Sequence, residues 1–488
     1  MASTYSSNGE FSKGSQGAVP GRLLAIGLIA GLALVMAYLA TTGNWRIAAA
    51  IIVLPLVIVV MHRYPFITMT VWLLLDPFLL SSTTASERAV YWVTHRALPP
   101  LTIVVILMSS LLGISKRKAP KLGWPEVGML GYVLASLLSI VYWNKDPLAT
   151  SFLFYDRVIS PMCLYLVVRL SIPDEADMRR LMPAVLFLGV SQSIIGILSW
   201  FDPQLLPPVW LELAGLRTTG SLINTTVYST TLVFSGLLVL HHGLNQKKAV
   251  TRNLFIAAFL LVLFCVLISF SRASWLSIGI VLLGVAFLYP KFMVRTAMLG
   301  AVVAMLFGGF LLTRLDWAVR WANERLYSQE AQVSAFSRVP VALAAVSMFE
   351  ARPILGWGYG NFDLIAPQFQ GQIDIGVNGD DRLHASHNFY LSLLAEQGLV
   401  GFILFVSPIL YWLARTFRAA KKMPPEGFWS RRLPMILWLV LLNEVILINF
   451  ANLRVVFGWG LWWVTLGFIA NFIYLQEHKE ASAPAPGA

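Results

Sequence analysis

One short segment gathers residue types that can move a proton. It runs from Asp380 to Asn388 (DDRLHASHN) and leads directly into an apolar stretch that begins at Phe389. Ser386 or Asn388 is suited to cap a helix there, which would place His387 at or just before the first turn. The positive end of the helix dipole disfavours an imidazolium, so His387 is expected to stay neutral and able to accept a proton. A general base is one interpretation, and a capping or interfacial histidine without chemistry is the other.

The carboxylates around His387 differ in what they can do. Asp380 or Asp381 can orient the imidazole from the same loop. Glu396 lies nine residues beyond His387, which on a straight helix is about half a turn out of phase and roughly 13 Å deeper. Glu396 is therefore expected to tie this helix to a neighbour. Asp380, Asp381, His384 and His387 form no convincing open metal site, so no metal is predicted.

Two arginines are placed to meet an anion. Arg272 lies at the turn between two strongly apolar stretches, where a guanidinium without a partner is costly. Arg217 precedes Gly220 and Asn224 at the start of another apolar helix, whose free N–H groups suit a phosphate. Two arginines and a helix N-terminus at one face can hold a diphosphate. The alternative for each is that it reaches toward water and pairs with surface carboxylates.

Two further sites carry weaker signals. The segment Gly356–Phe362 (GWGYGNF) alternates glycine with aromatic residues but lacks the GxGxxG spacing of a phosphate loop. It is expected to form a tight turn that packs close to lipid or sugar. Asn443 and Glu444 fall near the middle of an apolar stretch, where hydrogen bonding between helices is the expected role and an ion pathway is the alternative.

The composition indicates which elements position these residues. The 488 residues are 57% hydrophobic and 12% charged, with a mean hydropathy of +0.71, whereas a soluble domain is about 25% charged. The chain is therefore predicted to be an integral membrane protein. The net charge of +12 does not by itself indicate nucleic-acid binding. Cys163 and Cys265 lie in apolar runs, which argues against a disulfide framework.

Apolar runs of about 20 residues predict an all-α polytopic protein with about 14 membrane-spanning helices. The predicted spans are 23–40, 45–62, 66–80, 97–114, 125–142, 152–168, 181–200, 226–242, 254–270, 273–290, 296–313, 388–414, 433–449 and 456–475. Of these, the run 66–80, which Asp76-Pro77 interrupts, is the weakest.

The loops predict a topology and a domain organisation. Clusters such as SKRKAPK (115–121) and RTFRAAKK (415–422) place both termini in the cytoplasm. The basic residues assigned to the outside are all arginine except Lys145, and arginine suits phosphate and carboxylate. The predicted parts are a disordered cytoplasmic tail 1–22, spans 1–11 in 23–313, a large periplasmic loop 314–387, spans 12–14 in 388–475 and a cytoplasmic tail 476–488.

The large loop is too long for an idle connection and is expected to fold as a cap. Helices are predicted at 316–327 and 334–350. In the second of these, an apolar stripe is expected at Val339, Leu343, Val346 and Phe349.

Taken in chain order, these landmarks resemble the bacterial O-antigen ligase and O-antigen (exopolysaccharide) polymerase superfamily. The matching features are Arg217 with Gly220 and Asn224, Ser271-Arg272, Arg338, Pro353–Phe362, His387–Leu391, Glu396, Gly398 and Gly401.

The resemblance implies a GT-C-like, metal-independent glycosyltransferase without a cofactor. Such an enzyme moves a glycan from undecaprenyl diphosphate to an acceptor hydroxyl at the periplasmic face of the bacterial inner membrane, and we expect inversion at the anomeric carbon. By resemblance, His387 is the general base, and Arg217 and Arg272 bind the diphosphate. Arg338, Asn388, Glu396 and Asp381 are expected in supporting positions.

The acceptor stays open. A glycan repeat unit, a lipid A core and a protein all need the same base and diphosphate clamp, and a polymerase is preferred among the three. The chain departs from the commoner ligase pattern of about 12 spans. An anion transporter of the bicarbonate type is the alternative function, but its midplane would offer Asn443 and Glu444, and an acidic residue suits an anion poorly.

Overall fold

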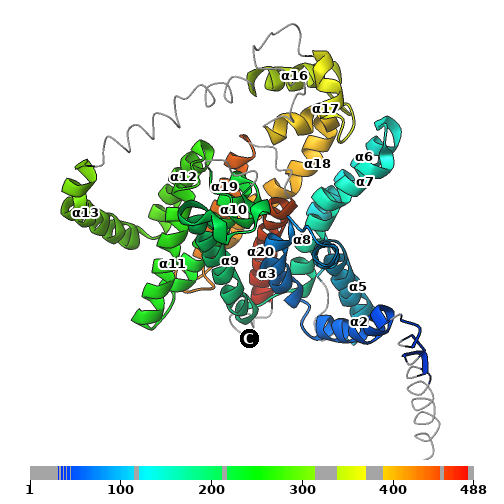
Figure 1. Ribbon diagram of the computed structural model, residues 1–488, viewed down its shortest axis with the longest axis horizontal. Helices are drawn as coiled ribbons and strands as arrows, with labels where there is room; N and C mark the ends of the chain where they lie inside the picture. Colours follow the sequence, from blue (N-terminus) through cyan, green and yellow to red (C-terminus); the bar gives the residue numbers. More distant parts are fainter. Residues whose placement is uncertain are drawn as a thin grey trace, which may run out of the picture. The chain divides into compact units, whose positions relative to one another are not determined.

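The computed structural model describes residues 31–114 (except 32, 33, 37, 40 and 44), 120–211, 217–313, 338–369, 388–450 and 456–481 (Figure 1). All regular secondary structure in these ranges is helical, which confirms the predicted all-α class. The chain divides into two units, Met1–Tyr64 and Pro65–Ala488. The first contains helix α2 (Trp45–Arg63), and the second contains the described residues discussed below.

The second unit is a sequence of helices joined mostly by short turns. The bounds are α3 (Ile67–Leu79), α4 (Ala85–Tyr91), η1 (Trp92–Ala97), α5 (Leu98–Leu111), α6 (Trp124–Trp143), α7 (Pro147–Phe154), η2 (Tyr155–Ile159), α8 (Ser160–Ser171), α9 (Glu175–Phe201), η3 (Pro203–Leu205), η4 (Pro208–Trp210), η5 (Gly220–Leu222), α10 (Thr225–Leu244), α11 (Ala249–Leu267), α12 (Arg272–Leu288), α13 (Pro290–Thr313), α16 (Arg338–Ala351), α17 (Phe362–Ile365), η6 (Ala366–Phe369), α18 (Phe389–Ala420), α19 (Arg432–Leu447) and α20 (Val456–Ala481).

Helices α10 and α20 lie at the centre of this unit (Figure 1). Both are almost entirely buried. Helix α10 packs against α9, α11 and α19, while α20 packs against α8, α18 and α19. Small residues permit this close packing: a Cβ at Gly236 of α10 would lie 2.9 Å from Val262 of α11. Such small-residue contacts are how membrane helices approach one another, since lipid supplies little hydrophobic drive for their association.

The structure shows part of the predicted set of spans. Among the described residues, eight helices are long and apolar enough to cross a membrane, or up to nine if the broken pair Ile51–Arg63 and Ile67–Leu79 is one span. Fourteen spans are not shown, partly because several apolar helices are too short. Helices α3, α19 and α12 have 13, 16 and 17 residues, below the roughly 20 that a hydrocarbon core requires. The predicted span 23–40 falls mostly outside the described residues.

Helix α16 confirms a helix in the region predicted at 334–350, while 316–327 lies outside the described residues. Its buried face differs from the expected apolar stripe. Val339 and Leu343 are 54% and 52% exposed, whereas Ala344 and Met348 are fully buried. Small side chains let α16 pack tightly against α18, so burial follows the alanine face rather than the bulkiest apolar residues.

Candidate functional site

Three arginines from distant parts of the sequence line one pocket of about 80 Å³. They are Arg217, which follows the η4 turn, Arg272, the first residue of α12, and Arg338, the first residue of α16. Thr225 and Thr226 at the start of α10 also line the pocket. The structure therefore brings together Arg217 and Arg272, which the sequence proposes as an anion clamp, and adds Arg338 to them.

The pocket is strongly electropositive. Burial and, after it, the charges of Arg272 and Arg217 lower the pKa of Arg338. The Arg338 Nε atom is buried and has no hydrogen-bond partner among the described residues. None of the described residues that line the pocket is a carboxylate. Three guanidinium groups gathered at one pocket favour the binding of an anion.

Two helix N-termini reinforce this charge. The Asn224 side chain caps α10 by accepting hydrogen bonds from the backbone N–H groups of Thr226 at 2.8 Å and Val227 at 3.2 Å. Ser271 caps α12 in the same way, through the Ser274 N–H at 3.3 Å. The positive ends of both helix dipoles therefore meet at the arginine pocket.

The turns that lead into these two helices share an unusual backbone. Ile223, directly before the α10 cap, has φ of 62°, and Phe270, directly before the α12 cap, has φ of 52°. A β-branched or bulky residue in this region is a steric outlier that costs about 1–3 kcal/mol. The strain falls at the entrances to the two helices that supply the pocket with N-termini.

The start of α18 lies next to the same pocket. Asn388 is its N-cap, as predicted, and accepts a hydrogen bond from the Leu391 N–H at 3.1 Å. The Asn388 Nδ2 atom donates to Asn449 Oδ1 at 3.4 Å, and the Phe389 N–H donates to the Ile448 carbonyl at 2.9 Å. Phe450, the next residue after Asn449, lines the arginine pocket. We call these contacts between the start of α18 and the end of α19 the α18–α19 junction.

His387 and Asp381 lie outside the described residues, and so do Asp380, His384 and Ser386. The general-base assignment of His387 and the orienting position of Asp381 therefore stay predictions.

Glu396 links α18 to a neighbouring segment, as the sequence predicts. Helix α18 is broken at Gly398, which has φ of 61° and ψ of −162°. The loop after α16 fills this break: the Leu399 N–H donates to the Pro353 carbonyl at 2.8 Å, and the Gly358 N–H donates to the Glu396 carbonyl at 2.7 Å. The Glu396 carboxylate accepts a hydrogen bond from the Phe362 N–H at 3.0 Å.

The glycine-rich segment is a tight turn, as predicted, and it packs against protein on two sides. A Cβ at Gly356 would lie 2.4 Å from the Glu396 backbone, so only glycine permits this approach. On the other side, the Tyr359 N–H donates to Ser139 Oγ at 3.1 Å, and Asn144 Nδ2 of the α6 C-cap donates to the Tyr359 carbonyl at 3.1 Å. The turn therefore links α18 to α6.

Asn443 forms the predicted link between helices, since its Oδ1 accepts a hydrogen bond from Ser277 of α12 at 2.7 Å. Glu444 is fully buried, and neither of its carboxylate oxygens has a hydrogen-bond partner among the described residues. Its placement favours neither a link between helices nor an ion pathway.

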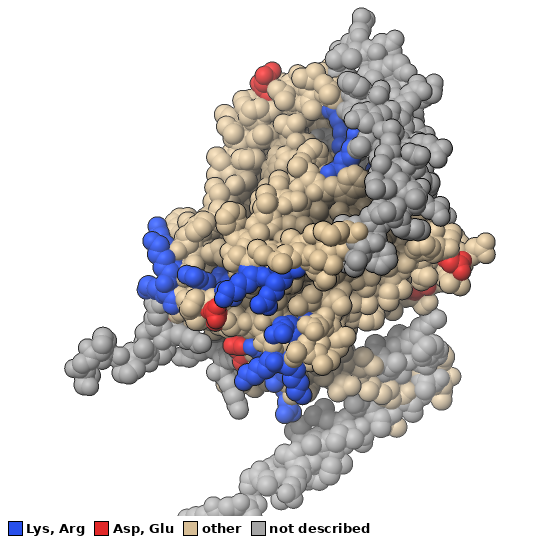
Figure 2. Space-filling view, turned by 90° about the vertical axis from the view of Figure 1, so that its left-hand side faces the viewer, with Lys and Arg blue, Asp and Glu red and all other residues tan. Residues whose placement is uncertain are grey.

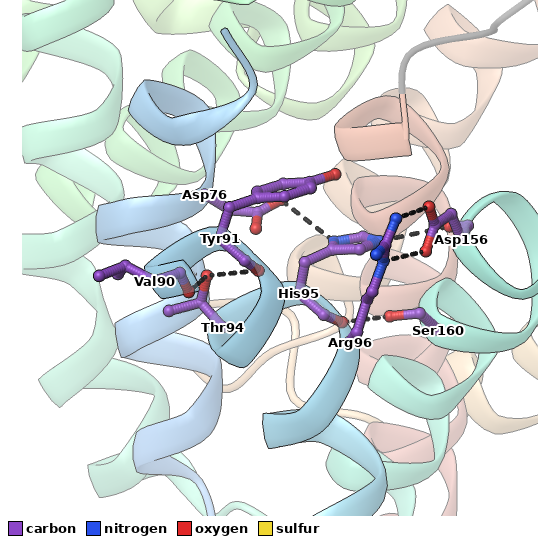
Figure 3. Close-up of polar contacts among 8 residues, drawn as sticks. All are labelled: Asp76, Val90, Tyr91, Thr94, His95, Arg96, Asp156 and Ser160. Carbon is purple, nitrogen blue, oxygen red and sulfur yellow. Dashed lines mark hydrogen bonds and ion pairs between the residues drawn. The ribbon is translucent and has the colours of Figure 1, made fainter. Parts of the chain in front are cut away.

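The structure reveals a charged cluster that the sequence interpretation missed (Figure 3). Asp76 and His95 are both fully buried, with Oδ2 and Nδ1 3.3 Å apart, and Arg96 forms two hydrogen bonds to Asp156 at 2.6 and 2.7 Å. The Ser160 hydroxyl donates to the His95 carbonyl.

This cluster ties α3 to the two π-helical turns η1 and η2, which lie inside longer helices. The available signal was the presence of Asp76, His95, Arg96 and Asp156 within or beside apolar runs, where ionisable residues need partners.

Charged side chains are unevenly distributed over the surface. On the face drawn in Figure 2, basic side chains form a larger group toward the lower end and a smaller, recessed group toward the upper end.

Part of the chain matches a known protein family. Residues 257–406 match the family model described as O-Antigen ligase. The matched range includes Arg272, Arg338, the glycine-rich turn, His387 and Glu396. No curated protein matches the chain. The helical architecture and this match together identify the chain as a multi-pass membrane protein that carries an O-antigen ligase family domain.

Proposed function

We propose that the protein is an inverting, metal-independent glycosyltransferase. It moves a glycan from undecaprenyl diphosphate to an acceptor hydroxyl at the periplasmic face of the bacterial inner membrane. The observation that carries this proposal is the arginine pocket, in which Arg217, Arg272 and Arg338 meet the N-termini of α10 and α12. The family match supports the substrate class, since the O-antigen ligase family implies lipid-linked glycans.

The pocket suits the diphosphate of such a donor. Its volume of about 80 Å³ is small, which suits compact phosphate groups. Guanidinium groups bind phosphate oxygens in pairs, with charge-assisted hydrogen bonds. Arg217 and Arg272 hold the diphosphate in this proposal, and Arg338 adds a third charge.

An apolar groove further along α12 fits the lipid part of the donor. It has a volume of about 510 Å³ and an almost wholly apolar lining from α12, α18 and α19, including Phe287, Ile409 and Leu441. Gly284 borders it on α12, 12 residues or about 18 Å from Arg272. A polyprenyl chain in this groove would lie along the helix whose N-terminus faces the diphosphate.

The proposed reaction is a single displacement at the anomeric carbon of the donor glycan. His387 accepts the proton of the acceptor hydroxyl while that oxygen forms the new bond to carbon. The bond between carbon and the phosphate oxygen breaks, and its electron pair leaves with the diphosphate. The arginines stabilise the charge that develops there. His387 directly precedes Asn388 of the α18–α19 junction, and Asp381 is proposed to orient its imidazole.

The assignment of the arginine pocket to the periplasmic side rests on α18, because basic residues cluster near only one end of this helix. The helix begins at Asn388, and near its other end the chain carries Arg415, Arg418, Lys421 and Lys422. Basic residues beside a span favour the cytoplasm. The Asn388 end and the arginine pocket then face the periplasm.

Reconstitution tests the activity and the acceptor together. The purified full-length protein in proteoliposomes receives an undecaprenyl-diphosphate-linked oligosaccharide with candidate acceptors, in buffer with and without EDTA. A ladder of repeat units identifies a polymerase, and one discrete lipid A adduct identifies a ligase. Absence of donor consumption with every acceptor contradicts the enzyme assignment. Loss of activity in EDTA that a divalent cation restores contradicts the metal-independent mechanism.

A further inference from the structure

A second cavity borders the α18–α19 junction. It has a volume of about 250 Å³ and is lined by residues from α6, α7, η2, the glycine-rich turn, α17, α18 and α20. Phe389 of the junction lines this cavity, while Phe450, which directly follows Asn449 of the junction, lines the arginine pocket. The two sites therefore share the junction, and they are built from different helices.

Aromatic rings form one wall of this second cavity. The Phe389 and Trp459 ring centroids are 4.6 Å apart, and Phe405 lies 5.9 Å from both Trp459 and Trp463. These rings support one another in a packed cluster, so the wall has a fixed shape. Flat aromatic faces of this kind pack against the C–H faces of sugar rings.

The other wall is polar and carries both signs of charge. Glu396 lines the cavity, and the backbone N–H groups of Phe362 and Gly360 occupy only part of the acceptor capacity of its carboxyl group. Arg157 lines the cavity and is partly exposed. Ser392 also lines it, is only 7% exposed, and its hydroxyl has no hydrogen-bond partner among the described residues. A buried hydroxyl without a partner costs free energy, which a ligand with hydroxyl groups would recover.

The polar wall is held in place before any ligand binds. The break at Gly398 and the glycine-rich turn fix Glu396 through backbone hydrogen bonds. The neighbouring Gln397 accepts from Ser136 at 2.9 Å and donates to the Tyr132 hydroxyl at 3.1 Å. Such an arrangement lowers the cost of ordering a binding site.

We propose that this cavity binds one sugar ring of the acceptor glycan. Mixed charge and aromatic faces suit a polyhydroxylated ring, in contrast to the all-cationic arginine pocket. The volume is just below the range of about 300–1,000 Å³ for small-molecule pockets, which limits the ligand to a small unit.

The assignment of this cavity to the acceptor glycan, rather than to the donor glycan, rests on the proposed glycosyl transfer. Inversion requires the attacking hydroxyl and the leaving group to lie on opposite faces of the donor sugar. The arginine pocket holds the leaving diphosphate on one side of the α18–α19 junction in this scheme. The aromatic cavity, which borders the same junction from other helices, then receives the acceptor.

Binding of soluble glycans without any donor tests the cavity directly. The probes are the repeat-unit oligosaccharide released from the lipid-linked donor by mild acid and the core oligosaccharide released from lipopolysaccharide in the same way. Arg157→Gln should weaken binding of at least one probe about tenfold, and Ser392→Ala several-fold, since each removes hydrogen bonds to the ring. The control is Arg180→Gln, on a side chain that is 75% exposed near the start of α9. Thermal melting in detergent verifies that all variants are folded.

Kinetics distinguish this inference from the proposed function. With a competent donor, Arg157→Gln should raise the acceptor KM about tenfold and leave the donor KM within about twofold of wild type. Unchanged probe binding in both cavity variants overturns the inference while leaving glycosyl transfer intact. A raised donor KM with an unchanged acceptor KM also overturns it, because the cavity would then hold the donor sugar. If wild type binds a probe through Arg157 but consumes no donor, the proposed function fails and glycan binding in the cavity stands.

Discussion

Replacing Arg272 with lysine keeps a positive charge at this position, so the substitution tests the geometry of the guanidinium group rather than its charge. Lysine cannot bind two phosphate oxygens with a planar fork, and each lost charge-assisted hydrogen bond costs about 1.5–3 kcal/mol. Arg272→Lys should therefore lower kcat/KM for the lipid-linked donor by at least about tenfold in proteoliposomes. The control is Arg180→Lys, in an exposed pair with Asp177. Turnover of Arg272→Lys close to wild type would indicate that Arg272 is only structural.

Removing the charge of Arg338 should affect stability differently with and without a bound anion. Burial and the neighbouring charges of Arg272 and Arg217 lower its pKa, so removing its charge relieves repulsion in the empty pocket. Arg338→Gln should leave the melting temperature unchanged or raise it without an anion. Inorganic diphosphate should stabilise wild type by mass action, about 2.7 kcal/mol at 100 times Kd, and Arg338→Gln much less.

Equal stabilisation of wild type and Arg338→Gln by diphosphate would contradict a part for Arg338 in anion binding. The matched control is Arg352→Gln, because Arg352 lies 4.0 Å above the Trp357 ring and does not line the arginine pocket.

His387 is the residue-scale test of the base. His387→Ala should lower kcat by about 10²- to 10⁴-fold, the usual contribution of a general base, while the protein stays folded and inserted. His478→Ala, near the end of α20, is the histidine control. Glycan transfer that survives in His387→Ala refutes the base assignment.

At the scale of elements, the break in α18 depends on Gly398. Its φ of 61° is costly for a residue with a side chain, and a Cβ there would lie 2.4 Å from the Ile354 carbonyl oxygen. Gly398→Ala should lower the free energy of unfolding by at least about 1–3 kcal/mol, because the backbone is strained and the loop displaced. Thermal melting and glycan-probe binding both report this change, since the break also positions Glu396.

Gly300→Ala is the matched control for that experiment. Gly300 lies in α13, and no atom would be within 4 Å of an added Cβ. Alanine should be neutral or stabilising there. Similar losses in both variants would show that Gly398 has no special conformational requirement.

At the scale of the whole molecule, the proposal depends on which side of the membrane the arginine pocket faces. Lys145 lies beyond the end of α6, and Lys421 lies at the end of α18, and both are exposed. Lys145→Cys should react with a membrane-impermeant maleimide in intact spheroplasts, and Lys421→Cys only after permeabilisation. The free thiols Cys163 and Cys265 are partly or fully buried, and the parent protein is the labelling control. The reverse labelling pattern would place the site in the cytoplasm.

Much of this protein follows from its sequence alone. The scarcity of charge requires a membrane protein, because a water-facing surface cannot be built from so few charged residues. Asn388 is recognisable as a helix cap and Arg272 as an anion-binding candidate, because capping and the cost of an unpaired charge in a membrane are local effects. Hydropathy predicts more spans than the described helices show, because it does not distinguish a long helix from a short or broken one.

Only the tertiary structure decided which of these residues meet. Arg217, Arg272 and Arg338 are separated by 55 and 66 residues, and no local pattern predicts that three guanidiniums converge in one pocket. The partnership of Asp76 with His95 and the insertion of the glycine-rich turn into the α18 break also depend on contacts between distant segments. Sequence periodicity reports the environment of a residue along its own helix, whereas the position of one helix against another is set by the packing of the whole unit.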